Sequence, residues 1–500
     1  MPALALGLGI PFTRRMGAGI DAQAQAHYNR VIADGGLIPS GLVGVNNFFT
    51  TVKGIYGTSD ITTAISVGLD AQVLGYKLGA GAGTTAGQAA QKLYSCSGSS
   101  GDVVQTTAAS QPLLLVHSGA NYWFSSGVSG NYCSTPNSTA NNFGGAIDIK
   151  VLIKPNILGV AGALVNNAEG QGGNGYSLQL TSSDNLRFGT ATFGVNSTVS
   201  LANTNEIWVR VTSTGNLGTI TFYTSTDGIN WISGGTATDQ TRGASSSQLG
   251  IGALNNGNFA FNGAILRATI SNSIGGTPVV DFNPNQYNAA NSQTQWTSST
   301  GEIWSLNVGT ATTGYKGQIV TKTIVQGDGI DDNLRAASFS INLPAVTSYM
   351  ATRKYQNTAV GILYELGADA GSSSGIATAI NDGANRNAGT IFGNTANGKG
   401  YSSTNILNQL ITCVGDTSQP ANDEVLYFEN NVQLAINITF ANGNNTANIN
   451  QSVLNVFSRN AASLFANVIL NTFIIARQAD NSTNRTAVYN YIKSINGNSF

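Results

Sequence analysis

Apolar residues recur at helical spacing only near the two ends of the chain. Near the start, steps of three and four residues separate Val45, Phe48, Phe49 and Val52. The segment 21–36 predicts another helix, with Asp21 as its cap, helix-favouring Ala and Gln residues, and a Gly pair where the helix would stop. We expect a shorter third helix at 60–70, and at 77–95 a Gly- and Ala-rich loop leading into a short helix. Residues 1–96 are therefore predicted to form a small, mostly helical region.

From about residue 97 the pattern changes to short runs of Val, Ile, Thr and Tyr, separated by Gly, Asn and Asp. Such runs are typical of β-strands with turns between them, and 146–155, 207–213 and 219–225 are examples. Asp227-Gly228 separates two of these runs and predicts a hairpin, because Gly adopts positive φ without strain. Helical spacing returns only at 481–495, where Asn481 or Ser482 can cap a helix.

The strand-rich part of the chain contains an internal duplication. The run FNGAILRATI at 261–270 aligns without gaps with FANVILNTFII at 465–475, a constant offset of 465 − 261 = 204. The aligned pairs are Phe261 with Phe465, Ile265 with Ile469, Leu266 with Leu470, and Ile270 with Ile474. GVSGNY at 127–132 matches GIDDNL at an offset of 329 − 127 = 202, and two strand–turn–strand segments correspond in between. The shared order of these landmarks indicates two copies of one domain.

Each copy has many short strands with turns every 8–12 residues, which favours a two-sheet jelly-roll sandwich. The predicted fold class is therefore mainly β, with two tandem antiparallel jelly-roll sandwiches after the helical region. We place the domains at 1–96, 97–312 and 313–500.

Composition excludes several functional classes. Charged residues make up 9% of the 500 residues, against about 25% in average globular chains. The formal charge is −1 without a basic block, so we expect no nucleic-acid partner. No apolar run approaches the roughly 20 residues that span a bilayer, so we expect no membrane insertion. In the first 15 residues the arginines follow the apolar run, the reverse of a secretory signal. Free buried thiols are expected for the three cysteines, with a Cys96–Cys133 bridge as the alternative.

The ordered set of GDGIDDNL, YFENNV and the segment from FSRN (457–460) to the C-terminal helix resembles the laminin-G-like, concanavalin-A-like lectin module. The resemblance covers both copies and is clearest in the second. It implies two packed antiparallel sheets whose concave face or rim loops often bind glycans. Segments 2–12, 92–115 and 291–307 are similar to structural proteins of tailed phages of Bacteroidota, including crAss-like phages.

The resemblance implies a phage virion structural protein, a head or tail fibre or a decoration, made in the host cytoplasm. The N-terminal region would attach it to other virion proteins, and the lectin-like domains would project outward, with a host-surface glycan as a partner. Homo-oligomerisation, as a trimer, is expected by analogy. The alternative is a secreted bacterial carbohydrate-binding protein or an accessory protein of a glycanase.

Enzymatic activity is not expected. Glucanases of the lectin fold use Glu-x-Asp-x-x-Glu carboxylates, and no glutamate of this chain lies in that pattern. Glu424 and Glu429 flank one predicted strand and would point to opposite faces. His27 and His117 are the only histidines, too few for a His-based metal centre, and a catalytic triad is equally disfavoured.

Two groups of residues are candidates for binding. Sugars are usually held by an aromatic face and by Asp or Asn groups. This predicts glycan contacts at Asp227, Asn230 and Trp231 on one hairpin, and at Tyr122 and Trp123; the competing interpretation places both tryptophans in a core. Asp328, Asp331 and Asp332 share one turn and could hold Ca²⁺, although a solvated Asp/Gly turn is favoured. No other cofactor is expected.

Overall fold

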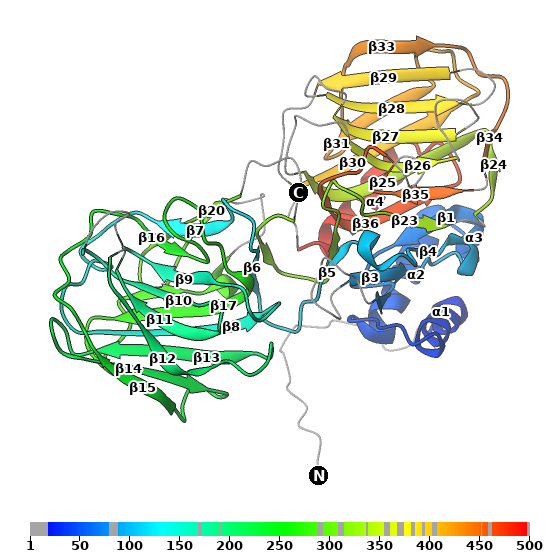
Figure 1. The fold of residues 1–500 in the computed structure, drawn as a ribbon. Helices are drawn as coiled ribbons and strands as arrows, with labels where there is room; N and C mark the ends of the chain where they lie inside the picture. Colours follow the sequence, from blue (N-terminus) through cyan, green and yellow to red (C-terminus); the bar gives the residue numbers. More distant parts are fainter. Residues whose placement is uncertain are drawn as a thin grey trace.

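The protein is mainly β, with several antiparallel sheets and a small helical region at the N-terminal end (Figure 1). The structure is a computed structural model. It describes residues 19–79, 89–168, 173–190, 192–287, 294–308, 315–336, 339–354, 361–367, 375–381, 386–392, 396–402, 408–451, 453–458 and 463–497. These residues form a first sandwich, at the left of Figure 1, and a second sandwich that carries the helices.

One sheet of the first sandwich has the strand order β15-β14-β13-β8-β17-β6-β21, with β18 paired to β17. Its strands are β6 (Tyr122–Ser126), β8 (Ile147–Pro155), β13 (Ile207–Ser213), β14 (Thr219–Ser225), β15 (Ile232–Thr238), β17 (Asn262–Ser271), β18 (Val280–Phe282) and β21 (Gln318–Val320). The predicted Asp227-Gly228 hairpin is confirmed, because β14 and β15 pair on either side of it. The 3-10 turn η3 (Pro284–Gln286) follows β18.

The opposing sheet has the order β12-β11-β10-β9-β16-β7-β20-β19. Its strands are β7 (Tyr132–Thr135), β9 (Gly162–Asn166), β10 (Ser177–Leu180), β11 (Asn185–Gly189), β12 (Gly194–Ser200), β16 (Leu249–Ile251), β19 (Gln295–Thr297) and β20 (Ile303–Asn307). Alternate residues of both sheets point inward, as the period of two requires. Ile149 and Val151 of β8 meet Leu178 and Phe188 of the opposing sheet in one core.

The second sandwich is built on the same plan. One layer runs β32-β31-β30-β25-β36-β22-β5, and β1 pairs with the same edge of β36 as β22. These strands are β1 (Ile65–Leu69), β5 (Leu113–Leu115), β22 (Ile324–Gln326), β25 (Ala345–Lys354), β30 (Asn408–Asp416), β31 (Val425–Glu429), β32 (Val432–Gln433) and β36 (Val468–Ala476). The other layer runs β33-β29-β28-β27-β26-β35-β23-β4-β3-β2.

The strands of this second layer are β2 (Tyr76–Gly79), β3 (Ala89–Leu93), β4 (Val103–Val104), β23 (Leu334–Ala336), β26 (Gly361–Leu366), β27 (Gly375–Asn381), β28 (Arg386–Phe392), β29 (Ala396–Ser402), β33 (Ile436–Asn442) and β35 (Leu454–Val456). A separate two-stranded ladder joins β24 (Ile341–Leu343) to β34 (Ile449–Gln451). The 3-10 turns η1 (Ser99–Gly101) and η2 (Ala108–Ser110) lie on either side of β4.

The helices cover the outer face of β36. They are α1 (Ala22–Ala33), α2 (Gly41–Tyr56), α3 (Ile61–Ala64) and α4 (Ser482–Ile495). Asp21 caps α1 by accepting the backbone N–H groups of Gln23 and Ala24, as the sequence predicts. Phe48 of α2 meets Tyr491 of α4 with ring centroids 5.9 Å apart. Ile474 of β36 belongs to the same apolar cluster as Phe48.

Two of the predicted helices are wrong. The expected third helix at 60–70 ends after Ala64, because the apolar run 65–69 continues as β1 and pairs with β36. The short helix expected before residue 95 is the strand β3, which pairs with β2. In both places neighbouring strands offer hydrogen-bond partners that the local sequence does not reveal.

The predicted domain boundaries also differ from the structure. Strands β1 to β5, all before residue 116, are hydrogen-bonded into the second sandwich. Strand β21, which lies beyond residue 312, completes the first sandwich by pairing with β6. The first sandwich therefore runs from 122 to 320, inserted between the two parts of the second. The N-terminal helices are a layer of that second sandwich and not a separate region; the boundary at 312–313 itself lies outside the described residues.

The two copies exchange their first three strands. Strands β19, β20 and β21 precede the second copy in sequence but belong to the first sandwich. There β20 pairs with β7, β21 pairs with β6, and β19 pairs with β20. In the same way, β3, β4 and β5 precede the first copy but belong to the second sandwich, where β4 pairs with β23, β5 pairs with β22, and β3 pairs with β4. The two exchanged pairings have the same register. The first residue of β6, Tyr122, lies opposite the last residue of β21, Val320, and the first residue of β22, Ile324, lies opposite the last residue of β5, Leu115.

The predicted duplication holds, but its alignment at the last strand is wrong by one residue. Both β17 and β36 contain a bulge, at Leu266 and at Asn471, an offset of 471 − 266 = 205. At that offset Ile265 corresponds to Leu470, and each points into its own core. Strand β36 is apolar on both faces, because the helices and the junction between the sandwiches cover its outer side. A shift of one residue therefore still aligned apolar residues with apolar residues, which gave the predicted offset of 204.

Cys96, Cys133 and Cys413 are all buried free thiols, so the alternative Cys96–Cys133 bridge is not formed. Among the described residues, the helices are all too short or too polar to cross a lipid bilayer.

Candidate functional site

Tyr122 and Trp123, two of the predicted glycan contacts, lie in the interior. Trp123 is fully buried in the core of the first sandwich. Tyr122 is 9% exposed and donates its hydroxyl to the carbonyl oxygen of Val116 at 3.0 Å. The Trp123 ring therefore offers no face to a ligand, whereas Tyr122 lines a cavity of about 280 Å³ together with Leu115 and Phe124. The prediction for Trp123 was wrong, because an apolar run with a buried Trp has the same sequence pattern as an aromatic binding platform. A glycan contact at Tyr122 stays a prediction.

Asp227, Asn230 and Trp231 do lie together, on the turn between β14 and β15. The carboxylate of Asp227 is occupied by its own turn: it accepts the backbone N–H groups of Asn230 and Ile229, both at 2.8 Å, and the Asn230 amide at 2.7 Å. These hydrogen bonds, the one from Asn230 N–H first, hold the pKa of Asp227 well below its usual range. The polar groups of this turn therefore stabilise the turn itself.

The Trp231 ring packs against its own sheet. It meets Tyr223 edge-on at 6.4 Å, and the Arg210 guanidinium lies 5.2 Å from its centroid. Arg210 is in turn held by Asp148 through two hydrogen bonds of 2.8 and 2.7 Å. Trp231 is half-buried, so a glycan contact at this hairpin stays a prediction.

A cavity of about 500 Å³ lies on the outer face of the other sheet of the first sandwich. Strands β9, β10 and β11 form its floor, and the loop between β16 and β17 forms one wall. Leu178 and Phe188 point into the core, so their neighbours Gln179 and Arg187 point outward into this cavity. The lining residues are mostly amides and hydroxyls: Asn166, Ala168, Ser177, Gln179, Arg187, Thr190, Leu254, Asn255, Asn256 and Phe259.

The floor of this amide pocket is a connected polar network. Gln179 donates to the Ser177 hydroxyl at 2.8 Å and accepts from the Arg187 guanidinium at 3.3 Å. Gly194 leaves the room that Arg187 needs, since a Cβ there would lie 2.3 Å from the guanidinium carbon. The side chains of the floor are thus fixed before any ligand arrives.

Two buried carbonyl oxygens of the pocket make no hydrogen bond. These are Oδ1 of Asn166, a residue only 2% exposed, and Oδ1 of Asn255. The Asn255 amide group is held at its other end, where it donates to the carbonyl oxygen of Ala168 at 3.2 Å. A buried acceptor without a donor costs about 1–3 kcal/mol, so such groups point to a ligand or water that supplies the donor.

Phe259 stands at the rim of the pocket in a strained conformation. Its φ of 58° lies in the left-handed region, which side chains other than Gly adopt at a cost of about 1–2 kcal/mol. Its ring is 44% exposed, so burial in a core does not explain the strain. The Ala163 N–H donates to the Phe259 carbonyl oxygen at 2.9 Å and fixes this conformation on β9. Strain of this kind is concentrated at binding sites.

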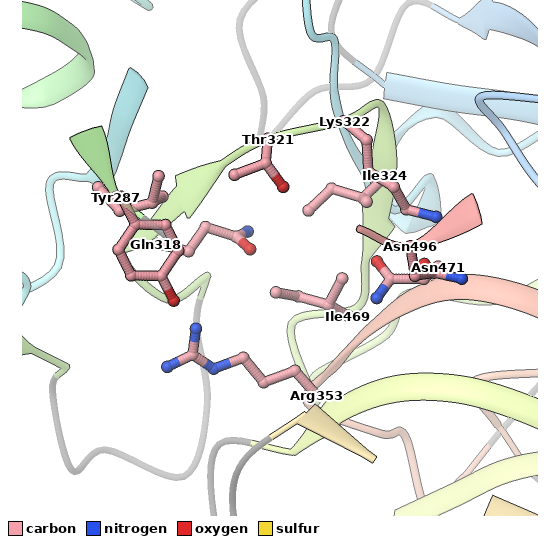
Figure 2. A pocket seen from close by; sticks show the side chains of 10 residues that line it. Tyr287, Gln318, Thr321, Lys322, Ile324, Arg353, Ile469, Asn471 and Asn496 are labelled. Atoms are coloured by element: carbon pink, nitrogen blue, oxygen red, sulfur yellow. The ribbon is translucent and has the colours of Figure 1, made fainter. Parts of the chain in front are cut away.

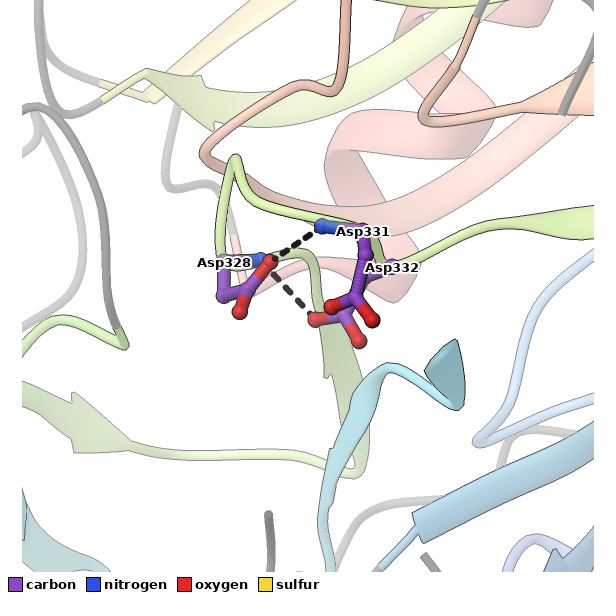
Figure 3. Close-up of side chains that lie close together, drawn as sticks. All are labelled: Asp328, Asp331 and Asp332. Carbon is purple, nitrogen blue, oxygen red and sulfur yellow. Dashed lines mark hydrogen bonds between the residues drawn. The ribbon is translucent and has the colours of Figure 1, made fainter. Parts of the chain in front are cut away.

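The three aspartates of the predicted metal site do converge. Asp328, Asp331 and Asp332 lie on the turn between β22 and β23, and Figure 3 shows their carboxylates side by side. One carboxylate oxygen from each lies within 4.8 Å of the others. The backbone N–H of Asp328 donates to Asp332 at 2.9 Å, and that of Ile330 to Asp328 at 2.7 Å.

A further, much smaller cavity of about 40 Å³ lies at the junction of the two sandwiches. Figure 2 shows Tyr287 and Gln318 on one side and Lys322 and Asn496 on the other, with the Arg353 side chain extending toward the Tyr287 side. Its size admits a water molecule and excludes a saccharide.

The acid–base groups singled out in the sequence have structural contacts. The Glu424 carboxylate is fully buried and accepts hydrogen bonds from the side chains of Asn397 and Asn445, at 2.8 and 2.7 Å. His27 contacts the Leu74 carbonyl oxygen at 2.8 Å, and burial lowers its pKa. His117 contacts Asn121 at 3.2 Å.

Comparison with known proteins gives structural matches alone: no family model matches the chain, and no curated protein does. The solved structures to which it is similar include mouse laminin α1 chain domains LG4-5, at 10% identity and a TM-score of 0.27, over 73% of this chain and 95% of that one. A putative carbohydrate binding protein from Bacteroides ovatus matches at 13% identity and a TM-score of 0.30, over 46% and 67%. The LG1-3 region of the laminin α2 chain matches at 10% identity and 0.27, over 78% and 67%.

Sheet order and register therefore define the class of protein: a mainly antiparallel β protein of two sandwiches, with a preformed polar cavity on the outer face of one sheet.

Proposed function

We propose that the first sandwich binds a saccharide in the amide pocket. The observation that carries this proposal is the pair of buried, unpartnered oxygens on Asn166 and Asn255 in a cavity lined by amides and hydroxyls. Sugar hydroxyls are donors that can reach such oxygens, and each also accepts hydrogen bonds from neighbouring amide N–H groups.

The remaining lining supports the same ligand class. Phe259 offers an exposed aromatic ring at the rim, against which the C–H face of a pyranose can stack. Arg187 is the one charged residue that lines the cavity, among the described residues. Its guanidinium can donate to ring hydroxyls or to an acidic substituent. A volume of about 500 Å³ falls in the range of small-ligand sites and accommodates a short saccharide.

For the whole protein, the role that we propose is a virion decoration or fibre of a tailed phage that presents this pocket to host-surface glycans. Support comes from the sequence resemblance and from a composition with 9% charged residues, which leaves an exterior rich in short uncharged polar groups. Attachment through the N-terminal helices to other virion proteins, assembly as a trimer, and the absence of enzymatic activity are parts of this proposal. A secreted carbohydrate-binding protein would use the same pocket, and mass spectrometry of purified virions distinguishes the two.

A glycan array probed with the full chain tests the binding proposal. We expect defined neutral or acidic glycans to bind, and Gln179→Ala to weaken binding about tenfold, because the loss of one hydrogen-bonding side chain costs roughly 1 kcal/mol or more. Trp231→Ala is the matched control and should bind as the wild type does. If Trp231→Ala abolishes binding and Gln179→Ala does not, the site lies at the hairpin. If the wild type binds no glycan, the proposal is wrong.

A further inference from the structure

We propose that the side chains of Lys399 and Asn442 join covalently, through an isopeptide bond that forms spontaneously within the folded chain. These residues belong to the paired strands β29 and β33 of the second sandwich, so the bond does not depend on the saccharide proposal. The Lys399 ammonium group donates to Oδ1 of Asn442 at 2.6 Å. A carbonyl bond is about 1.23 Å long, so Nζ of Lys399 lies at most about 3.8 Å from Cγ of Asn442. Reacting atoms about 3–3.5 Å apart are in a conformation close to reaction.

The environment of Lys399 favours the neutral amine that this reaction needs. Lys399 is fully buried, and within the described part of the chain its ammonium group forms no ion pair. Burial lowers the pKa of Lys399, and the negative charge of Glu424 opposes this effect only in part. A desolvated lysine with a lowered pKa is a good nucleophile, because the neutral amine has a free electron pair.

A buried carboxylate holds the chain on both sides of this pair. Glu424 precedes β31 in the opposing layer and accepts the side-chain amides of Asn397 and Asn445, at 2.8 and 2.7 Å. Asn397 lies on the same face of β29 as Lys399 and is the register partner of Asn442. Asn445 follows Asn442 by three residues. Glu424 is therefore a positioning residue that keeps the amine and the carboxamide together.

The reaction balances without an oxidant or any further reactant. Nζ of Lys399 forms a bond to Cγ of Asn442, and the bond from Cγ to Nδ2 breaks. The proton that the amine gives up passes to Nδ2, which leaves as ammonia. One neutral amide replaces another, so neither the oxidation state nor the charge changes. Asn442 is exposed, so water can carry the proton and the ammonia leaves into the solvent.

The bond would fasten an edge strand. Among the described strands, β33 lies at the edge of its layer, outside β29 (Figure 1). The corresponding sheet of the first sandwich runs β12-β11-β10-β9-β16, so β12 takes the place of β29 and is itself the edge of the described sheet. Edge strands are open to pairing with other chains. A covalent link between 399 and 442 would hold β33 in place and stabilise the fold by restricting the unfolded chain.

Tryptic peptide mapping of the full chain by mass spectrometry tests the proposal. Trypsin cuts after Lys and Arg, and between Arg386 and Arg459 the only such residue is Lys399. Without the bond, trypsin releases 387–399 and 400–459 as two peptides. With the bond, Lys399 is no longer cut, and 387–459 stays one peptide that is lighter than its sequence by one ammonia. We expect this second result. In protein refolded from urea, the undivided peptide should form faster at higher pH, because only the neutral amine attacks.

Two variants separate this bond from another loss of ammonia, since Asn442 precedes Gly443 and such a pair can cyclise onto its own backbone. Lys399→Arg keeps a positive hydrogen-bond donor but lacks the nucleophilic amine. It should give 387–399 and 400–459 at full mass, and unfold several degrees below the wild type. Lys493→Arg, which removes a lysine from the C-terminal helix, is the matched control and should keep the undivided peptide.

The role of Glu424 is tested by the rate of bond formation. Glu424→Gln should form the undivided peptide at least about tenfold more slowly in a preparation that circular dichroism shows to be folded, and Glu424→Asp should recover part of the rate. Equal rates would contradict the positioning role. The whole proposal is overturned if trypsin cuts the wild type at Lys399, whether or not 400–459 has lost ammonia.

Discussion

Leu115 of β5 lies directly opposite Ile324 of β22, although the whole first sandwich separates them in the sequence. This pairing places the two chain crossings side by side, where the His117 N–H also donates to the Thr323 hydroxyl at 3.2 Å. Around the crossings, residues of both sandwiches share one apolar cluster that includes Leu115, Phe124 and Ile469. The sandwiches are thus joined by paired strands and a common core, and not by a flexible linker alone.

The strand exchange predicts which fragment of the chain folds alone. Residues 117–321 contain every strand of the first sandwich, β21 included, and should unfold in one cooperative transition. Residues 97–312 follow the boundaries that the sequence predicts, but lack β21 and leave the β6 edge with Trp123 unpaired. We expect this fragment to be aggregated or to unfold at a clearly lower urea concentration. Circular dichroism and urea titration measure both; equal stability of the fragments would contradict the exchange.

Asp70 should be among the most sensitive positions of the second sandwich. It is buried, accepts the Thr472 hydroxyl at 2.7 Å, and lies 3.7 Å from the Lys322 ammonium group. Asp70→Asn leaves Lys322 buried without a counter-charge, which should lower the free energy of unfolding by about 3–5 kcal/mol. Denaturant unfolding measures this loss. Lys322→Met added to Asp70→Asn should recover part of it, and a double variant no more stable than the single one would argue against the ion pair.

The hydrogen bonds of Asp34 predict that the stability of the fold depends on pH in the acid range. It accepts hydrogen bonds from Tyr94 at 2.7 Å, from Lys92 at 3.1 Å and from Lys77 at 3.2 Å, and these, Tyr94 first, lower its pKa from 3.8 to about 2. A lowered folded pKa gives stability that is present above pH 4 and lost as the pH falls from about 4 to about 2. Asp34→Asn should therefore unfold at a lower temperature than the wild type above pH 4, with the difference closing below pH 2. A constant difference over this range would exclude the linkage.

Phe259 should separate stability from binding. Phe259→Gly removes the exposed ring but permits the φ of 58°, so we expect the free energy of unfolding to fall by no more than about 0.5 kcal/mol or to rise. Phe188→Ala, a core change on β11 of the same sheet, should cost about 3–5 kcal/mol. Urea titration compares the two. A large loss for Phe259→Gly would mean that the ring supports the fold.

Much of the architecture could be predicted from the sequence, because it depends on local patterns. The Asp21 cap, the Asp227-Gly228 hairpin and the duplication follow from residues that are close in sequence or that recur in order. The exchange of strands could not be predicted. Leu113–Leu115 has the same pattern whichever sheet it joins, and only its partner Ile324 distinguishes the two arrangements.

The candidate site was less predictable than the fold. Asp328, Asp331 and Asp332 stand in one turn, so their convergence could be read directly. The amide pocket draws its lining from four separate segments of common polar residues, and the run LNNGNF at 254–259 was the single local signal. The predicted glycan contact at Trp123 was wrong because the sequence pattern of a buried indole is the same as that of an aromatic binding platform. Tertiary burial decides such cases.

The most direct test of the account is a calorimetric titration of the array-identified saccharide into the fragment 117–321 and into the full chain. The account predicts one site per molecule with equal affinity in both, because the amide pocket lies wholly within the first sandwich. Phe259→Gly and Asn255→Leu should each weaken binding at least tenfold while the fragment stays folded. Binding by the full chain alone, or unchanged affinity in both variants, would contradict it.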